Sequence, residues 1–480
     1  MSLQHGINTY KKPTRMVGVT RASVGIPLFV GCAPIHKAGK AFEAGPVLVN
    51  TFDEARELLG YSEAWRDAAG GPKWSLCQAA YGFLRLFQMA PCYLVNVYDP
   101  ASNKTAVAAA DLTVADHAVM LPEDAIDDAK LVVKTTGGAG SALVKGTDYD
   151  VIYTDDACVI DLLEDGSAYS AESLNVAYNK ADLSGINAAA IEAGIEQAEL
   201  CKGKYNIVPD LLCAPGWSQT PTVAAVLAAK ADNINGLFHG MAVVDLDTSA
   251  TGADSYDKVL TVKDAQGYTD ENTVVCWPLA KVGDRIFDMS VIVCGVMCRT
   301  DTNNGDLPYE SPSNKAVSLT GLVNKTGTEI PLTALKADSV SYYAGVVTAI
   351  NFGGWRIWGN YTGCFPGNSD PAYAFICCAR MMDFLSNSFV NTFWSFIDRP
   401  MNRVLIDAIV NTFNSFLDGL KNTEALLGGE IAYVEDNNPA ADLLAGKFRL
   451  DLQMASALPA QQINLFSEFS VDMLVNAINV

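Results

Sequence analysis

The C-terminal third of this chain limits its possible folds more than any other part, because two long amphipathic segments are followed there by two segments with strand patterns. In each amphipathic segment, apolar side chains recur every three or four positions, which places them on one face of a helix. The first set is Met382, Leu385, Phe389, Phe393 and Phe396, and the second is Leu405, Ile409, Phe413, Phe416 and Leu420. The pattern predicts two helices, separated at Pro400 and followed by Gly428-Gly429.

Two strands are predicted after the helices. Residues 448–454 alternate strictly between apolar and polar side chains, which is typical of a half-buried strand. Residues 466–475 alternate less regularly, with Phe469, Val471 and Met473 on one side, and we interpret them as a second strand. A strand this close to the last residue has no local partner for its outer edge, and unpaired edges attract other chains. The pattern therefore predicts that the protein assembles with other chains.

Several motifs resemble those of one protein family. The segment Trp355-Arg356-Ile357-Trp358-Gly359-Asn360, the helix pair with Leu426-Leu427-Gly428-Gly429 and the two strands resemble the C-terminal domain of contractile tail sheath proteins, which form the sheaths of myophages and R-type bacteriocins. Residues 20–33, 51–97 and 298–314 are similar to other parts of the family. The chain departs from the family pattern at Met89-Ala90-Pro91, where Gly-Gly is usual, and after Trp358-Gly359, where Asn360-Tyr361-Thr362 replaces a triplet such as Asn-Arg-Thr. Roughly residues 100–185 lie outside the resemblance.

The resemblance implies a structural subunit rather than an enzyme, with no cofactor and no bound metal. Such subunits polymerise head-to-tail with copies of themselves around a tail tube protein, and they also contact baseplate and tail terminator proteins. On a baseplate signal the sheath contracts and drives the tube through the target cell envelope. The expected location is a virion tail or a bacteriocin particle, assembled in the host bacterial cytoplasm. Whether the particle is a phage or a headless bacteriocin stays open.

Composition limits the other possibilities. The chain has 480 residues, 50% of them hydrophobic and 18% charged, as in a folded multidomain protein. Its net charge of −21 argues against nucleic acid and anionic membranes as partners, because both need basic surfaces. There is no apolar run of about 18 residues and no secretory pattern, so we expect no membrane binding by the chain itself. The twelve cysteines are scattered without a Cys-x-x-Cys pair, which favours buried thiols over zinc ligands.

The predicted fold is a multidomain protein of α/β and α+β class, with mixed-sheet α/β core domains and extended arms at both ends. Residues 101–185 stand out as an acidic segment with short strand patterns, and we interpret them as an inserted, protruding β-rich domain. The full division is an N-terminal linking arm (1–22), an N-terminal α/β domain (23–100), the insert (101–185), a middle α/β domain (186–350), a C-terminal α+β domain (351–463) and a C-terminal linking strand (464–480).

An α/β core also raises the alternative of a cytosolic enzyme with an inserted β domain. The sequence has neither a phosphate-binding Gly-x-x-x-x-Gly-Lys-Ser/Thr loop nor a Gly-x-Gly-x-x-Gly motif between a strand and a helix. Ser218 follows a predicted strand but lacks the Gly-x-Ser-x-Gly turn of a nucleophile, and Asp245 and Asp247 are more typical of loop caps than of a metal site. His36 and His239 have no evident partner. A third alternative is the sheath of a cytoplasmic contractile injection system.

The candidate site residues follow from the two chain ends. We expect the N-terminal arm and the C-terminal strand each to pair with a sheet of a neighbouring subunit, because backbone hydrogen bonds then join the copies. The arm residues are Arg15, Met16, Val17, Gly18, Val19 and Thr20, and the C-terminal residues are Phe466, Glu468, Phe469, Val471, Met473 and Val475. The host strand is predicted at Phe448, Leu450, Leu452 and Met454. Arg399, Arg403 and Lys421 are candidates for contact with an acidic tube, although ordinary surface charge interleaved with Asp407, Asp418 and Glu424 is the favoured explanation.

Overall fold

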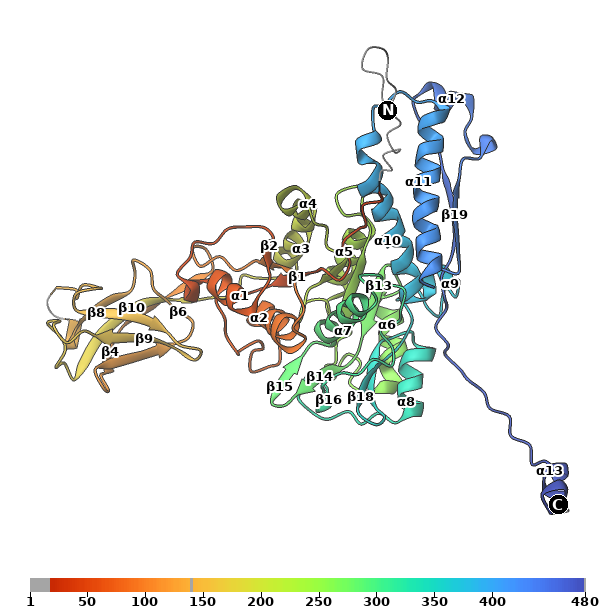
Figure 1. Ribbon diagram of the computed structural model, residues 1–480. Coiled ribbons are helices and arrows are strands. Elements are labelled where there is room, and N and C mark those ends of the chain that lie inside the picture. Colours follow the sequence, from red (N-terminus) through yellow and green to blue (C-terminus); the bar gives the residue numbers. More distant parts are fainter. Residues whose placement is uncertain (1–17, 139–140, 479–480) are drawn as a thin grey trace, which may run out of the picture.

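The computed structural model describes residues 18–138 and 141–478, and its centre is a six-stranded sheet (Figure 1). Five strands run parallel, and β2 pairs antiparallel at one edge. The order is β13-β12-β11-β1-β3-β2. The strands are β1 (Pro27–Gly31), β2 (Val47–Val49), β3 (Cys92–Asn96), β11 (Leu211–Cys213), β12 (Met241–Asp245) and β13 (Thr273–Cys276). Parallel strands need crossover connections, and the helices that supply them confirm the predicted α/β core.

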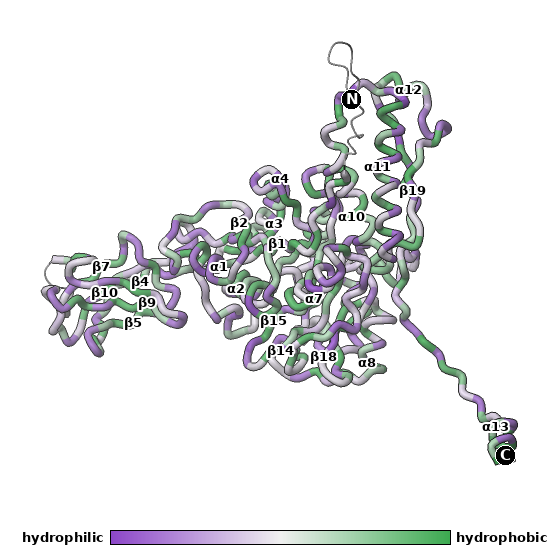
Figure 2. Tube along the Cα trace, viewed as in Figure 1, coloured by the Kyte–Doolittle hydropathy of each residue, from purple (hydrophilic) through white to green (hydrophobic). Residues whose placement is uncertain are grey.

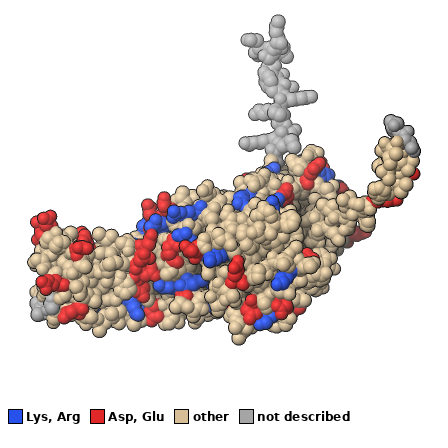
Figure 3. Space-filling view, turned by 90° about the horizontal axis from the view of Figure 1, so that it is seen from below, with Lys and Arg blue, Asp and Glu red and all other residues tan. Residues whose placement is uncertain are grey.

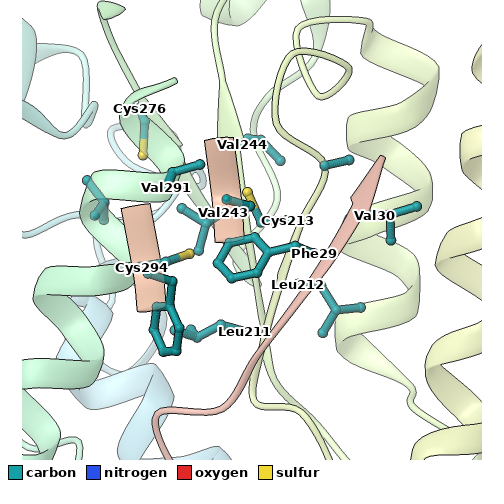
Figure 4. Packing of buried hydrophobic residues seen from close by; sticks show 14 of the residues in the cluster. Phe29, Val30, Leu211, Leu212, Cys213, Val243, Val244, Cys276, Val291 and Cys294 are labelled. Atoms are coloured by element: carbon teal, nitrogen blue, oxygen red, sulfur yellow. The ribbon is translucent and has the colours of Figure 1, made fainter. Parts of the chain in front are cut away.

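Helices cover both faces of this sheet. Val30 of β1 points toward α3, where a Cβ added to Gly194 would lie 2.7 Å from Val30 Cγ1. The next residue, Gly31, faces α2, because successive side chains of a strand point to opposite faces. Figure 4 shows Phe29 pointing to the side of the sheet on which Val291 and Cys294 of α7 lie, with Val30 pointing the other way. The covering helices are α2 (Ser75–Ala80), α3 (Ala188–Glu196), α5 (Pro221–Asp232) and α7 (Met289–Asn303).

The central sheet combines two segments that the sequence analysis separates. β1 and β3 come from residues 23–100, whereas β11, β12 and β13 come from residues 186–350, and all five lie in one sheet with one hydrophobic core. The two α/β domains are therefore a single structural unit. Sequence patterns predict individual strands, but they do not identify which distant strands become neighbours.

Smaller elements surround the sheet. β14 (Leu279–Val282), β15 (Arg285–Phe287) and β16 (Gly321–Val323) form a three-stranded sheet, and β17 (Thr348–Asn351) pairs with β18 (Trp355–Trp358). The remaining helices of this part are α1 (Phe52–Leu59), α4 (Leu200–Tyr205), α6 (Val259–Gln266), α8 (Ala334–Asp338) and α9 (Pro371–Ala374).

The residues of the acidic insert form β-sheets with a hydrophobic core of their own. β4 (Lys104–Thr113), β6 (Ala125–Ile126), β7 (Val132–Thr135) and β10 (Ser173–Ala181) form one sheet, and β5 (Ala118–Pro122), β8 (Tyr149–Tyr153) and β9 (Ala157–Leu162) form another. It projects from the core at the end away from α10 and α11, with acidic side chains on its surface (Figures 1 and 3). Glu123 joins it to the core by accepting hydrogen bonds from Lys73 (2.7 Å), Lys37 (2.9 Å) and Ser62 (2.6 Å).

The C-terminal region contains the two predicted helices and one of the two predicted strands. α10 (Ile376–Phe393) and α11 (Arg403–Asn422) pack together, and α11 also packs on a two-stranded sheet of β19 (Gly428–Ala432) and β20 (Asp451–Ala455). α12 (Ala440–Leu444) lies between these strands in the chain. β20 overlaps the strand predicted at 448–454.

The strand predicted at 466–475 is wrong in this structure. Residues 456–470 form neither helix nor strand, and α13 (Val471–Ile478) is helical. All twelve cysteines are buried and free, as expected. Among the described residues, no helix is both long enough and apolar enough to span a membrane.

Candidate assembly surfaces

The predicted host strand is half-buried and has an open edge. Phe448, Leu450, Leu452 and Met454 are partly buried against the core of α10 and α11. On the β19 side, Asn414 of α11 bonds both backbone groups of Ile431, at 2.9 Å and 2.8 Å. α11 therefore closes the outer edge of β19 at that point. The sheet has only two strands among the described residues, so the outer edge of β20 is left for another strand.

An apolar groove of about 900 Å³ lies beside this sheet. It is formed by the end of α10, the α10–α11 connection, the start of α11 and the segment leading into β20. Two basic residues, Arg399 and Lys447, and one acidic residue, Asp398, stand among its apolar side chains. The apolar lining includes Phe389, Phe393, Phe396, Ile397, Met401, Leu405, Phe448, Leu450 and Leu452.

The N-terminal arm is joined to its own chain from Val19 onward. The backbone N–H of Thr20 donates to Thr392 Oγ1 (3.0 Å), and Val19 packs against the core of α10 and α11. The N–H of Ala22 donates to Ser388 Oγ (2.9 Å). Val19 and Thr20 are thus engaged within one copy, and Gly18 is exposed. The predicted linking residues Arg15, Met16 and Val17 lie outside the described residues.

The C-terminal arm, residues 456–478, leaves the body and runs away from it (Figure 1). A hydrogen bond holds its base, where Tyr361 Oη donates to Gln461 Oε1 (2.7 Å). Beyond that point its apolar side chains are exposed, with Ile463 at 89% and Phe466 at 92%. Figure 2 shows hydrophobic residues along this projecting segment. The predicted linking residues Phe466, Glu468, Phe469, Val471, Met473 and Val475 all lie on this exposed arm. Their role in joining copies stays a prediction.

The three basic residues proposed to face a tube do not form one patch. Arg403 pairs with Asp407 at 2.9 Å, and Lys421 pairs with Asp418 at 2.6 Å. These two basic residues lie near opposite ends of α11, about 27 Å apart along a helix with a rise of 1.5 Å per residue. Arg399 lies over the ring of Phe396, at 4.2 Å from its centre. Because two of the charges are balanced locally, the geometry favours ordinary surface charge.

A buried ionic cluster, which the sequence analysis missed, joins α10 to the core. Arg380 donates to both oxygens of Asp301 in α7, at 3.0 Å and 2.6 Å, and to Asp210 at 2.8 Å. Asp210 also accepts the backbone N–H groups of Gly25 (3.0 Å) and Ile26 (2.7 Å) at the start of β1. Burial alone would lower the pKa of Arg380, but the two carboxylates hold it above its usual value. In the sequence, a lone arginine inside the apolar run 376–382 is the feature that indicates a buried charge in need of a partner.

The residues considered for an enzyme have structural partners. Sheets with this strand order bind ligands beyond the carboxyl ends of their strands, at the point where the order reverses. Here buried Asp288 fills the space beside the loop after β11, and it accepts hydrogen bonds from Arg66 (2.7 Å), Gln78 (2.6 Å) and Gln219 (3.0 Å). Ser218 Oγ accepts the backbone N–H of Asp245 (3.0 Å).

The other candidate ligands also have ordinary roles. Asp247 Oδ1 accepts the backbone N–H of Ser249 (3.0 Å), as a loop cap does. Burial among aromatic rings lowers the pKa of His36 to about 4. Within the part of the chain that the structure describes, no three His, Cys, Asp or Glu residues are grouped to hold a metal ion.

Comparisons with known proteins agree with the sequence motifs. The tail sheath protein of Burkholderia phage BcepMu is 26% identical over 98% of this chain and 98% of its own length. The tail sheath protein of Escherichia phage P2 is 22% identical over 59% of this chain and 69% of its own length. The resemblance to contractile tail sheath proteins is confirmed. No protein-family model matches the chain.

Solved structures show the same fold. The contracted baseplate of the anti-feeding prophage contains a chain that matches 98% of this one and 99% of itself, with a TM-score of 0.58 and 14% identity. The contracted sheath complex of an extracellular contractile injection system, PVC, matches 98% of this chain and 100% of its own, with a TM-score of 0.57 and 13% identity. The curated relatives are structural sheath proteins, which confirms the prediction that the chain is not an enzyme.

Proposed function

We propose that this chain is the sheath subunit of a contractile tail, which polymerises around an inner tube and shortens to drive that tube through a cell envelope. The observation that carries the proposal is the full-length similarity to a phage tail sheath protein. The exposed arm adds a physical argument. A single copy leaves Phe466, Phe469 and Val471 at least 61% exposed, and apolar side chains gathered on one projecting segment mark a surface for another chain.

The mode of assembly follows from the two ends of the chain. A copy that offers its arm to the next copy, and accepts the arm of the previous one, makes head-to-tail contacts that close into rings or extend as helices. Beyond Gln461, residues 462–469 are exposed and form neither helix nor strand, so they join copies without fixing the angle between them. Subunits joined in this way rotate relative to one another while they stay connected, which is what contraction requires.

Contraction then needs a source of free energy, and we propose that it comes from interfaces formed only in the shortened sheath. A kinetic barrier holds the extended form until the baseplate releases it. The partners are other copies of the chain, a tail tube protein, and baseplate and tail terminator proteins. The location is a phage tail or a related particle, since phage tail sheath proteins and an extracellular injection system both resemble this chain.

Negative-stain images of the purified protein test the proposal, because striated hollow cylinders identify a sheath. Removing residues 456–480, or residues 1–17, should give folded subunits that form no cylinders. The pair Phe466→Asp and Phe469→Asp should act like the truncation, whereas the control Gln462→Asp adds charge to the same arm at a polar position and should still assemble. Cylinders from the truncated chain, or catalytic turnover by the intact one, would contradict the proposal.

A further inference from the structure

The insert meets the core beside α1 (Figure 1), and the contacts between them are mostly polar. Lys37 of the core is 5% exposed and donates to Glu123 Oε2 (2.9 Å) and to the backbone oxygens of Asp155 (3.0 Å) and Thr154 (3.4 Å) in the insert. Lys73 donates to the other oxygen of Glu123 (2.7 Å). The buried apolar residues of the insert and of the core form two separate clusters, so this polar junction holds the two parts together.

His36 lies inside the junction, between the core and the insert. Its ring centre is 5.8 Å from those of Trp74 and Tyr98 in the core and 5.8 Å from that of Tyr153 in the insert. The ring also forms a hydrogen bond of 3.3 Å from Nε2 to the backbone oxygen of Glu123. The residue is only 7% exposed, so both parts of the molecule contribute to its burial.

The second ring nitrogen of His36 is the atom that an added proton would occupy. A backbone oxygen only accepts hydrogen bonds, so the hydrogen of the neutral ring is on Nε2. Nδ1 is buried and has no hydrogen-bond partner among the described residues. A proton added there would place a positive charge and an unpaired donor in a buried site, which costs free energy. The docked junction therefore favours the neutral ring.

The charges around His36 do not offset this cost. The titratable groups that face it are Lys37, Lys73, Glu123, Tyr98 and Tyr153, with Asp99 and Asp124 near Tyr98. Burial raises the pKa of both tyrosine hydroxyls, so they stay neutral. Burial also lowers the pKa of His36 to about 4, and Lys37 and Lys73 act in the same direction, whereas Glu123 opposes them.

We propose that this junction is acid-sensitive, and that protonation of His36 releases the insert from the core. In the open form, in which the insert has left the core while both stay folded, water reaches the ring and the charged imidazole is solvated. The open form consequently binds a proton more readily than the docked form, and acidification favours opening. The proposal concerns a contact within one copy and does not depend on the assembly of copies.

The size of the effect follows from the two proton affinities. The pKa of His36 is about 4 in the docked form, and an imidazole in water has a pKa near 6.5. Between these values the open form is protonated and the docked form is not. The ratio of open to docked molecules should therefore rise about 25-fold between pH 7.5 and pH 5.

Energy transfer between two dyes on the full chain measures this ratio. The dyes are attached at Met120→Cys in the insert and at Asp284→Cys in the turn between β14 and β15 of the core, and both positions are exposed. All twelve native thiols are buried, so the dyes react with the introduced ones. Urea is held at a concentration that opens a small, measurable fraction of the insert at pH 7.5, while circular dichroism shows that the core stays folded.

Histidine variants identify the group that takes the proton. His36→Phe keeps a buried ring but cannot be protonated, so its ratio should change less than twofold between pH 7.5 and pH 5. His36→Gln keeps a donor for the backbone oxygen of Glu123 and should respond in the same way, which covers the case in which phenylalanine does not fit. His117→Phe is the matched control, because His117 is exposed on the insert and stacks on Tyr169 at 4.0 Å. It should keep the full 25-fold rise.

Three results would overturn the proposal. The first is a ratio in the unsubstituted chain that stays constant between pH 7.5 and pH 5. The second is an equal rise in both His36 variants, which would assign the sensor to another group. The third is unfolding of the core at every urea concentration that opens the insert, since the junction would then not open separately. None of these measurements involves cylinders, so the proposed sheath function stands or fails on its own test.

Discussion

Replacement of Arg380 by glutamine should destabilise the protein strongly, because buried Asp301 and partly buried Asp210 would lose their common partner. Arg380 and Asp301 are 4% and 1% exposed, and both oxygens of Asp301 depend on the guanidinium. Breaking a buried ion pair by removing one partner costs about 3–5 kcal/mol. At about 2 °C per kcal/mol, as for a large domain, the melting temperature should fall by about 6–10 °C.

The control is Arg403→Gln, which removes the same kind of side chain from an exposed pair. Arg403 is 69% exposed beside Asp407, and such helical pairs contribute about 0.3–0.5 kcal/mol, so its melting temperature should change by about 1 °C or less. Differential scanning fluorimetry measures both variants. Amide exchange should also become faster at Gly25 and Ile26, whose N–H groups bind Asp210.

A second variant separates charge from packing. Adding Asp301→Asn to Arg380→Gln removes one uncompensated buried charge, so part of the lost stability should return. If Arg380→Gln and Arg403→Gln melt within 2 °C of each other, the argument that this cluster holds α10 on the core is refuted.

Three further predictions rest on other parts of the structure. Burial raises the pKa of Asp383 to about 8 despite nearby Arg380, so the native state keeps a proton that the unfolded state releases near pH 4, and stability falls as pH rises from about 4 to about 8. Asp383→Asn should make the melting temperature fall less between pH 5 and pH 8.5. An unchanged fall in the variant would contradict the raised pKa of Asp383. Gly194→Ala should cost about 1–3 kcal/mol, because its Cβ would lie 2.7 Å and 2.8 Å from methyl groups of Val30 and Val97. Gly203→Ala, with no atom within 4 Å of its Cβ, should instead stabilise helix α4 slightly, and equal chemical denaturation midpoints for the two would contradict the packing argument. Glu123→Gln should loosen the attachment of the insert to the core. Burial would raise the pKa of Glu123, but hydrogen bonds from Lys73, Ser62 and Lys37 lower it to about 2, so these bonds strongly favour the charged carboxylate. Limited proteolysis near residues 100 and 183 should then be faster at pH 7. Unchanged cleavage would show that the hydrogen bonds to Glu123 do not hold the insert on the core.

The helix pair and the insert were predictable because their signals are local. The stripe from Met382 to Phe396 and the alternation from Phe448 to Met454 depend only on spacing within a few turns or residues. The insert differs in composition from the segments on either side. These features need no knowledge of what lies across the fold.

The central unit and the ionic cluster were not predictable in this way. Leu28 of β1 pairs with Leu212 of β11, 184 positions later. The sequence of neither strand indicates which other strand it pairs with. Arg380, Asp301 and Asp210 likewise come from three separate segments, so a burial pattern around one of them does not reveal the others. Long-range pairing of this kind is decided by the packing of the whole core.

The strand predicted for the C-terminal arm is wrong because apolar residues recur there with two periodicities at once, that of a strand and that of a helix. Phe469, Val471 and Met473 alternate as in a strand, while Val471, Leu474 and Ile478 recur as on a helix. In a single copy, a strand here would leave its backbone groups without ladder partners, whereas a helix satisfies them within the segment. The helix therefore prevails when no partner is bound.

A partner can preserve or reverse that preference. A sheet edge supplies backbone hydrogen bonds and therefore favours a strand, with alternate side chains on each face. An apolar groove supplies side-chain contacts and therefore favours a helix with one apolar face. The conformation of residues 471–478 in the assembled state consequently identifies the surface that holds them. If the amides of these residues and those of Leu452 and Met454 in β20 are all protected from exchange in cylinders, the sheet edge binds the arm. If residues 471–478 are protected while the amides of β20 still exchange, the groove binds it.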